Sequence, residues 1–156
     1  MRRRGGRAFA VGFLLLWVAL PSAADREFSE PIERLFTTTF VELWEAGDAD
    51  GLADLWLEHG DWMSMVGSRR IVSGREAIAG VWRVGLEGRE TPESLALAIE
   101  VQSVRKLGAD LAAVDLEMTF GTEETGVIRE GMSAIVERLP EGWRIASARV
   151  ARIPDR

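Results

Sequence analysis

Cysteine is absent from the 156-residue sequence, so neither disulfides nor thiolate metal sites hold the fold, and no lipid can be attached through a cysteine. Histidine occurs once, so any imidazole chemistry must use His59. The sequence also lacks a phosphate-binding loop, a dinucleotide fingerprint, a nucleophile elbow and a zinc signature. We therefore expect no metal and no cofactor, and stability must come from the burial of apolar side chains.

Basic residues are scarce beyond the first 24 positions. Those positions hold four of the 19 lysines and arginines and none of the 25 acidic residues. The remaining chain has 15 basic and 25 acidic residues, which is a net charge of −10 with His neutral. Because nucleic acid is bound through a basic surface that releases counterions, we expect no nucleic-acid partner.

Residues 1–24 have the pattern of a cleaved secretory signal peptide. Arginines precede an uncharged, largely apolar run at residues 8–20. Ser22 and Ala24 place small side chains where signal peptidase needs them, so we expect cleavage before Asp25. A membrane anchor is the alternative, but the run is shorter than the roughly 20 residues that a transmembrane helix needs. The sequence therefore predicts export to the periplasm or the exterior, with no membrane contact after cleavage.

Apolar spacing predicts two helices at the start of the mature chain. The first is expected from Ser29, with Pro31 in its first turn, to Gly47. Asp48 is positioned to cap a second, shorter helix that His59-Gly60 would end.

A hairpin and a third helix are expected next. Residues 61–66 are strand-like, Gly67 and Ser68 form a turn, and residues 71–72 pair back. Ser73 and Glu76 have the spacing of a capping box, so we expect the helix to begin there. Its apolar stripe consists of Ile78, Val81, Trp82, Gly85 and Leu86.

The second half of the chain is strand-like. After a polar linker at residues 87–93, four strands are expected at residues 94–105, 111–120, 127–139 and 143–153. Because the links between them are short, the strands should form an antiparallel meander. Helices followed by strands indicate one α+β domain, residues 25–156, with helices packed on one face of a bent sheet.

Three stretches of the mature chain carry a resemblance to a known family. The first is residues 40–58, which include Trp44 and Gly47-Asp48-Ala49-Asp50. The second is Gly60-Asp61 followed by residues 74–78, and the third is Gly142-Trp143-Arg144-Ile145. Together they resemble the SnoaL-like and SgcJ/EcaC-type domains of the nuclear transport factor 2-like superfamily. The resemblance implies three N-terminal helices packed in a strongly curved, mainly antiparallel sheet, a cone with a central pocket. Such families include isomerases, cyclases, dehydratases and epoxide hydrolases, so the fold alone does not choose the reaction.

Asp61 and His59 are the candidate catalytic residues. A carboxylate partly desolvated beside Trp62 would have a raised pKa, which suits a general base. On a strand, residues two apart share a face, so His59 could relay a proton to Asp61. Two alternatives stay open: in one, Asp61 binds backbone amides or faces water, and in the other, His59 interacts with the last carbonyls of a helix.

Several side chains are predicted to line a pocket with Asp61. Trp62 and Trp82 are the aromatic candidates, and Met118 lies on the second long strand. Asp115 and Glu117 alternate with apolar residues there, so they are either solvated or, if the wet face is the concave one, pocket acids. Solvated acids would form ion pairs with arginines of the neighbouring strands, namely Arg129, Arg144 and Arg149.

Two functions are compatible with these residues. One is an exported domain that binds a small apolar or amphipathic molecule in its cone, and the other is a cofactor-independent isomerase, cyclase or dehydratase with Asp61 as general base. The family resemblance adds a third, a structural module that forms a homodimer through the outer face of the sheet.

Overall fold

The structure is a computed structural model that describes residues 22–66, 69–89, 91–124 and 126–154. The predicted signal peptide up to residue 21 and the predicted turn at Gly67 and Ser68 lie outside these residues. No helix of the described ranges is both long enough and apolar enough to cross a membrane.

The first helical region is a continuous rod of three segments, α1 (Ala23–Arg34), the π-helical η1 (Leu35–Phe40) and α2 (Val41–Glu45). The predicted start at Ser29 is wrong, because Ser22 and Asp25 form a capping box seven residues earlier. Pro31 lies inside α1 rather than in its first turn. The rod ends before Gly47, whose φ of 69° is the left-handed conformation that glycine tolerates at a helix end.

The second helix, α3 (Ala49–Asp54), is shorter than predicted. Asp48 caps it as expected, since its carboxylate accepts a 2.8 Å hydrogen bond from the Gly51 amide. The predicted end at His59-Gly60 is wrong, because both residues lie within strand β1 (Trp56–Ser64). Trp56 pairs in parallel with Ile145, so a distant strand decides the conformation of this segment.

The predicted hairpin is confirmed, but the predicted helix cap after it is wrong. Strand β2 (Arg70–Ser73) pairs antiparallel with β1, and Ser73 lies opposite Asp61 in that ladder. Helix α4 (Arg75–Leu86) therefore begins one residue later than a Ser73 cap requires. Its N-cap is Gly74, with a φ of 86° and no side-chain hydrogen bond. Ser73→Ala consequently loses no helix cap.

The four long strands form the predicted antiparallel meander, β3 (Leu97–Lys106), β4 (Leu111–Phe120), β5 (Ile128–Leu139) and β6 (Gly142–Arg152). Strand β6 also pairs in parallel with β1, which gives the order β2-β1-β6-β5-β4-β3. A short helix that the sequence analysis did not predict, α5 (Pro92–Leu95), begins in the expected linker, with Thr91 and Ser94 capping it reciprocally. It takes up residues 94 and 95, so the predicted strand start at residue 94 is wrong and β3 begins at Leu97.

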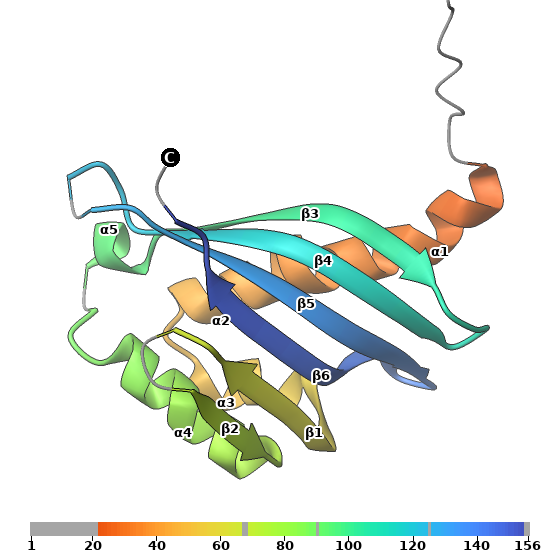
Figure 1. The fold of residues 1–156 in the computed structure, drawn as a ribbon, viewed down its shortest axis with the longest axis horizontal. Coiled ribbons are helices and arrows are strands. Elements are labelled where there is room, and N and C mark those ends of the chain that lie inside the picture. The colour runs from red at the N-terminus through yellow and green to blue at the C-terminus, as the bar shows by residue number, and fades with distance from the viewer. Residues whose placement is uncertain (1–21, 67–68, 90, 125, 155–156) are drawn as a thin grey trace, which may run out of the picture.

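The predicted α+β class is confirmed, with the helices on one side of a curved, unclosed sheet (Figure 1). The core lies between helices and sheet, and the other face of the sheet is uncovered by helices. The largest fully buried side chains are Trp56, Phe36, Phe40, Ile32, Leu52, Ile78, Met118, Met132, Ile145, Val114 and Val136. Alternate residues of each strand therefore face the helices, and the residues between them face outward.

Candidate functional site

A cavity of about 200 Å³ lies between α2 and α4 on one side and β1, β4 and β5 on the other. We call it the tryptophan pocket. Its lining is mostly apolar and aromatic and includes one acid and one arginine, as binding sites for small molecules commonly do. The lining residues are Trp44, Trp62, Ser64, Val81, Trp82, Gly85, Arg89, Phe120, Ile128 and Glu130.

Trp82 is the centre of the aromatic wall. Its ring centroid lies 6.3 Å from that of Trp44 and 6.1 Å from that of Trp62, with interplanar angles of 87° and 69°. Phe120 extends the wall, 5.2 Å from Trp44. Such edge-to-face contacts between large rings fix the shape of the pocket, because each ring locks the orientation of its neighbour.

Three indole N–H groups of this wall are unpaired. The Nε1 atoms of Trp44, Trp62 and Trp82 are buried and have no hydrogen-bond partner among the described residues. The neighbouring Trp56 differs, since its N–H donates to the Asp61 carbonyl at 3.2 Å. Because a buried polar group without a partner costs free energy, an acceptor brought to any of these donors would stabilise the protein.

Glu130 is the acid of the pocket. It lies opposite Met118 in the ladder of β4 and β5, on the face that the helices cover. Its carboxylate has no hydrogen bond or ion pair with any residue that the structure describes. Burial raises the pKa of Glu130, and the charges of Arg152 and Arg89 offset part of that shift. A carboxyl group of this kind can exchange a proton or pair with a ligand.

Arg89 supplies the positive charge, just after α4. Its guanidinium carbon lies 5.3 Å from the ring centroid of Trp44 and 5.9 Å from that of Phe120, within cation–π range. One guanidinium nitrogen, Nη1, donates to the Ser94 carbonyl at 3.1 Å. The aromatic wall therefore already holds a cation.

Asp61 does not share this pocket, so the predicted convergence of Asp61, Trp62 and Trp82 is wrong. Trp62 faces the helices, and its chain neighbour Asp61 faces the opposite side of the sheet. The Asp61 carboxylate accepts hydrogen bonds from Arg149 and, at 3.0 Å, from Ser147. The Arg149 hydrogen bond chiefly holds the pKa of Asp61 below its usual value, so the predicted rise is also wrong.

His59 is exposed on β1, within the stretch between Trp56 and Asp61 where the pairing with β6 is irregular. The partners of the Asp61 side chain among the described residues are Ser147 and Arg149, so the predicted His59–Asp61 pair is not formed. The expectation that residues two apart share a face holds only for a regular strand.

Asp115 and Glu117 also face away from the helices, as solvated acids of the outer sheet face. Asp115 accepts hydrogen bonds from Ser103 at 3.0 Å and Ser133 at 2.7 Å. Glu117 pairs with Arg129, whose Nε lies 2.6 Å from the carboxylate. Met118 faces inward but is buried beside the pocket rather than lining it. Of the predicted pocket residues, the tryptophan pocket therefore brings together Trp62 and Trp82, whereas Asp115 and Glu117 line a separate hollow of about 400 Å³ on the outer face of the sheet.

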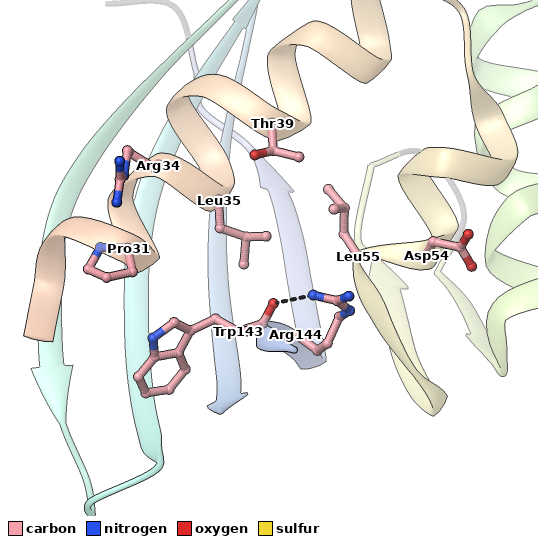
Figure 2. A pocket seen from close by; sticks show the side chains of 9 residues that line it. Pro31, Arg34, Leu35, Thr39, Asp54, Leu55, Trp143 and Arg144 are labelled. Carbon is pink, nitrogen blue, oxygen red and sulfur yellow. Dashed lines mark hydrogen bonds between the residues drawn. The ribbon is translucent and has the colours of Figure 1, made fainter. Parts of the chain in front are cut away.

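A larger hollow of about 360 Å³ lies near the start of β6, beside α1 and η1 (Figure 2). Pro31, Leu35, Leu55 and Trp143 give it apolar walls, and Arg144 donates to the Trp143 carbonyl at 3.0 Å. None of the buried, unpaired side-chain atoms found in the described residues belongs to it. The tryptophan pocket is therefore the better candidate, although it is smaller.

Sequence reasoning missed the roles of Glu130 and Arg89. The signal for Glu130 was available, because it is in phase with Met132 and Ala134 in the alternation of β5. Arg89 carried no such signal, since it lies in a stretch expected to be a polar linker. Only packing brings its side chain onto Trp44.

Comparisons with known proteins identify relatives by sequence pattern and by structure. The sequence profile described as the SnoaL-like domain matches residues 33–150. No curated protein sequence matches the chain.

Solved structures share the fold at low sequence identity. A domain of unknown function with a cystatin-like fold from Nostoc punctiforme has a TM-score of 0.67 and 21% identity, over 86% of this chain and 81% of that one. A nuclear transport factor 2-like protein of unknown function from Shewanella oneidensis has a TM-score of 0.64 and 17% identity, over 79% and 98%. A ketosteroid isomerase-like protein from Erwinia carotovora atroseptica has a TM-score of 0.61 and 16% identity, over 79% and 98%. These identities support a shared fold and nothing finer.

Proposed function

The chain belongs to the SnoaL-like domain family of the nuclear transport factor 2-like superfamily, and from this premise we propose that it binds a small apolar or amphipathic molecule in the tryptophan pocket. The observation that carries the proposal is the set of three buried, unpaired indole N–H groups around one cavity. A ligand with a hydrogen-bond acceptor would pair with one of these donors when its ring turns the N–H toward the cavity, while the apolar part of the ligand contacts the rings.

Binding should be visible in the indole N–H signals of a ¹⁵N–¹H spectrum. We expect a panel of small ketones, amides and alcohols to contain molecules that shift the signals of Trp44, Trp62 and Trp82. The signal of Trp56 is the internal control and should move less, because its N–H already donates to the Asp61 carbonyl. Tryptophan-to-phenylalanine variants assign the signals. A panel that shifts none of the three would contradict the proposal.

Glu130 favours a second function, a cofactor-independent enzyme such as an isomerase or a dehydratase. Proton transfer needs a titratable group inside the pocket, and Glu130 lies there with a raised pKa, whereas Asp61 lies on the other face of the sheet. If a ligand is turned over, Glu130→Gln should lower kcat about 10²–10⁴-fold and Asp61→Asn should leave it nearly unchanged. Equal losses from the two variants in a kinetic assay would assign the proton transfer elsewhere.

We also propose that the protein is exported, on the basis of the basic start, the apolar run and the small residues before Asp25. Cleavage there would remove Ser22, the cap of α1, but keep the contact of Phe28 with Trp143, whose ring centroids lie 5.3 Å apart. N-terminal sequencing of the exported protein checks the site, and a chain retained in the cytoplasm with Met1 intact would contradict export.

The homodimer stays a proposal with a simple test. The outer face of the sheet is uncovered by helices and carries the polar pairs of Asp61, Asp115 and Glu117. Light scattering on the purified protein gives the mass directly, and a monomeric mass at high concentration would exclude the pairing.

A further inference from the structure

The tryptophan pocket combines aromatic faces with an acid that has no partner. The face of an aromatic ring is electrostatically negative, and Trp attracts cations more strongly than the other aromatic side chains do. Trp44 and Trp62 each stand nearly perpendicular to Trp82, so the three rings form walls in different planes. Glu130 lines the same cavity and has neither a hydrogen bond nor an ion pair with the described residues. Both features favour positive charge.

The position of Arg89 is a second observation that favours a positive charge in this pocket. Its guanidinium lies over Trp44 and Phe120 at the distances given above, although no carboxylate of the described residues forms an ion pair with it. Its side chain also donates a hydrogen bond to the Ser94 carbonyl, and its charge acts on Glu130 without a contact short enough for an ion pair. The aromatic wall therefore holds the Arg89 guanidinium through cation–π contacts, with Glu130 as a more distant opposite charge, and a ligand cation could replace this guanidinium.

We propose that the ligand of the tryptophan pocket is a small organic cation with an alkylated ammonium group, which replaces the guanidinium of Arg89 against Trp44 and pairs with Glu130. This inference rests on the proposed binding function and names the ligand class. An inorganic cation fits less well, because no three acidic or histidine side chains of the described residues gather to coordinate one. An anionic ligand would be repelled by the carboxylate of Glu130 inside the cavity. The one arginine in the lining, Arg89, already lies against the ring of Trp44.

The test compares two probes of the same shape. Choline and 3,3-dimethyl-1-butanol differ in the replacement of a quaternary nitrogen by carbon, and hence in charge. In calorimetric titrations we expect choline to bind the wild-type protein about tenfold or more tightly than the neutral alcohol. Glu130→Gln preserves the shape of the side chain and should remove most of that preference. Asp61→Asn, on the other face of the sheet, is the matched control and should retain it.

Replacing Arg89 should change choline affinity in the direction opposite to that expected for Glu130→Gln. Arg89→Met keeps the length of the side chain and removes the competing charge, so it should strengthen choline binding. An anionic ligand site would behave in the reverse way, with choline unaffected or weakened and acetate binding lost in Arg89→Met. That result would overturn the inference.

The pH dependence adds a readout that a purely structural role of Glu130 would not produce. Cation binding favours the ionised carboxylate, so choline affinity should fall as the pH is lowered through the raised pKa of Glu130, with Arg89 and Arg152 the charged groups acting on it. Glu130→Gln should show no such dependence.

The remaining outcomes separate the two proposals. Equal binding of both probes overturns the cation inference and leaves the pocket as a site for neutral molecules. Binding of neither probe also overturns it, and the indole spectra with the neutral panel then decide separately whether the pocket binds anything.

Discussion

Replacing Trp82 by alanine should lower the free energy of unfolding by about 3–5 kcal/mol, the range for large aromatic side chains in a core. Trp82 is 6% exposed, and its ring contacts those of Phe40, Trp44, Trp56 and Trp62. Alanine removes all four contacts and leaves a space that rings held from several sides cannot easily fill. Urea denaturation followed by circular dichroism measures the loss.

Val84 provides the matched control for this variant on the same helix. Its side chain is 58% exposed, so Val84→Ala should change the free energy of unfolding by less than about 0.5 kcal/mol. Trp82→Phe keeps an aromatic ring in the cluster and should fall between the two. A loss below about 1 kcal/mol for Trp82→Ala would show that the ring cluster is not part of the stable core.

Gly60→Ala should destabilise the protein by about 1–3 kcal/mol, as overpacking in a rigid site does. A Cβ at this position would lie 3.0 Å from the carbonyl oxygen of Ile145, 3.1 Å from that of Leu57 and 3.1 Å from the ring of Trp56. Two of these neighbours are backbone atoms, so relief requires β1 to move away from β6 where their pairing is already irregular. Differential scanning calorimetry or urea denaturation detects the loss.

Substitution of a second glycine by alanine should increase the stability of the protein. Gly80 lies inside α4, and a Cβ there would meet nothing within 4 Å. Gly80→Ala should therefore stabilise the protein by about 0.5–1 kcal/mol, because alanine loses less backbone entropy in a helix. A Gly60→Ala variant as stable as the wild type, or more stable, would contradict the close approach of the backbone at Gly60.

The sequence predicted the elements whose signal is long and local. The stripe from Ile78 to Leu86 predicted α4, and the alternation of residues 111–120 predicted β4 with the same bounds as the structure. Asp48 was recognised as a cap because capping depends on a side chain and an amide three residues away. These features need no information from distant parts of the chain.

The errors lie where a distant partner outweighs the local pattern. Leu52, Leu55 and Trp56 have helical spacing, but pairing with β6 draws Trp56 into a strand. Ser73 has the spacing of a helix cap, but it pairs with Asp61 across the hairpin, and Gly74 takes the cap position. In both places the backbone hydrogen bonds of a sheet satisfy groups that a helix end would otherwise leave free.

The sequence by itself determined the fold class and the alternation of the strands, because these follow from the order and period of local patterns, and its resemblance to known domains indicated the SnoaL-like family. The alternation predicts that Asp61 and Trp62 face opposite sides of the sheet, and the same holds for Arg129 and Glu130. It does not predict which side of the sheet the helices cover. The tertiary structure decided this when α2 and α4 packed over Trp62 and Glu130. Burial raises the pKa of Glu130, whose carboxylate forms no hydrogen bond or ion pair with the described residues. On the open face, the hydrogen bond from Arg149 lowers the pKa of Asp61.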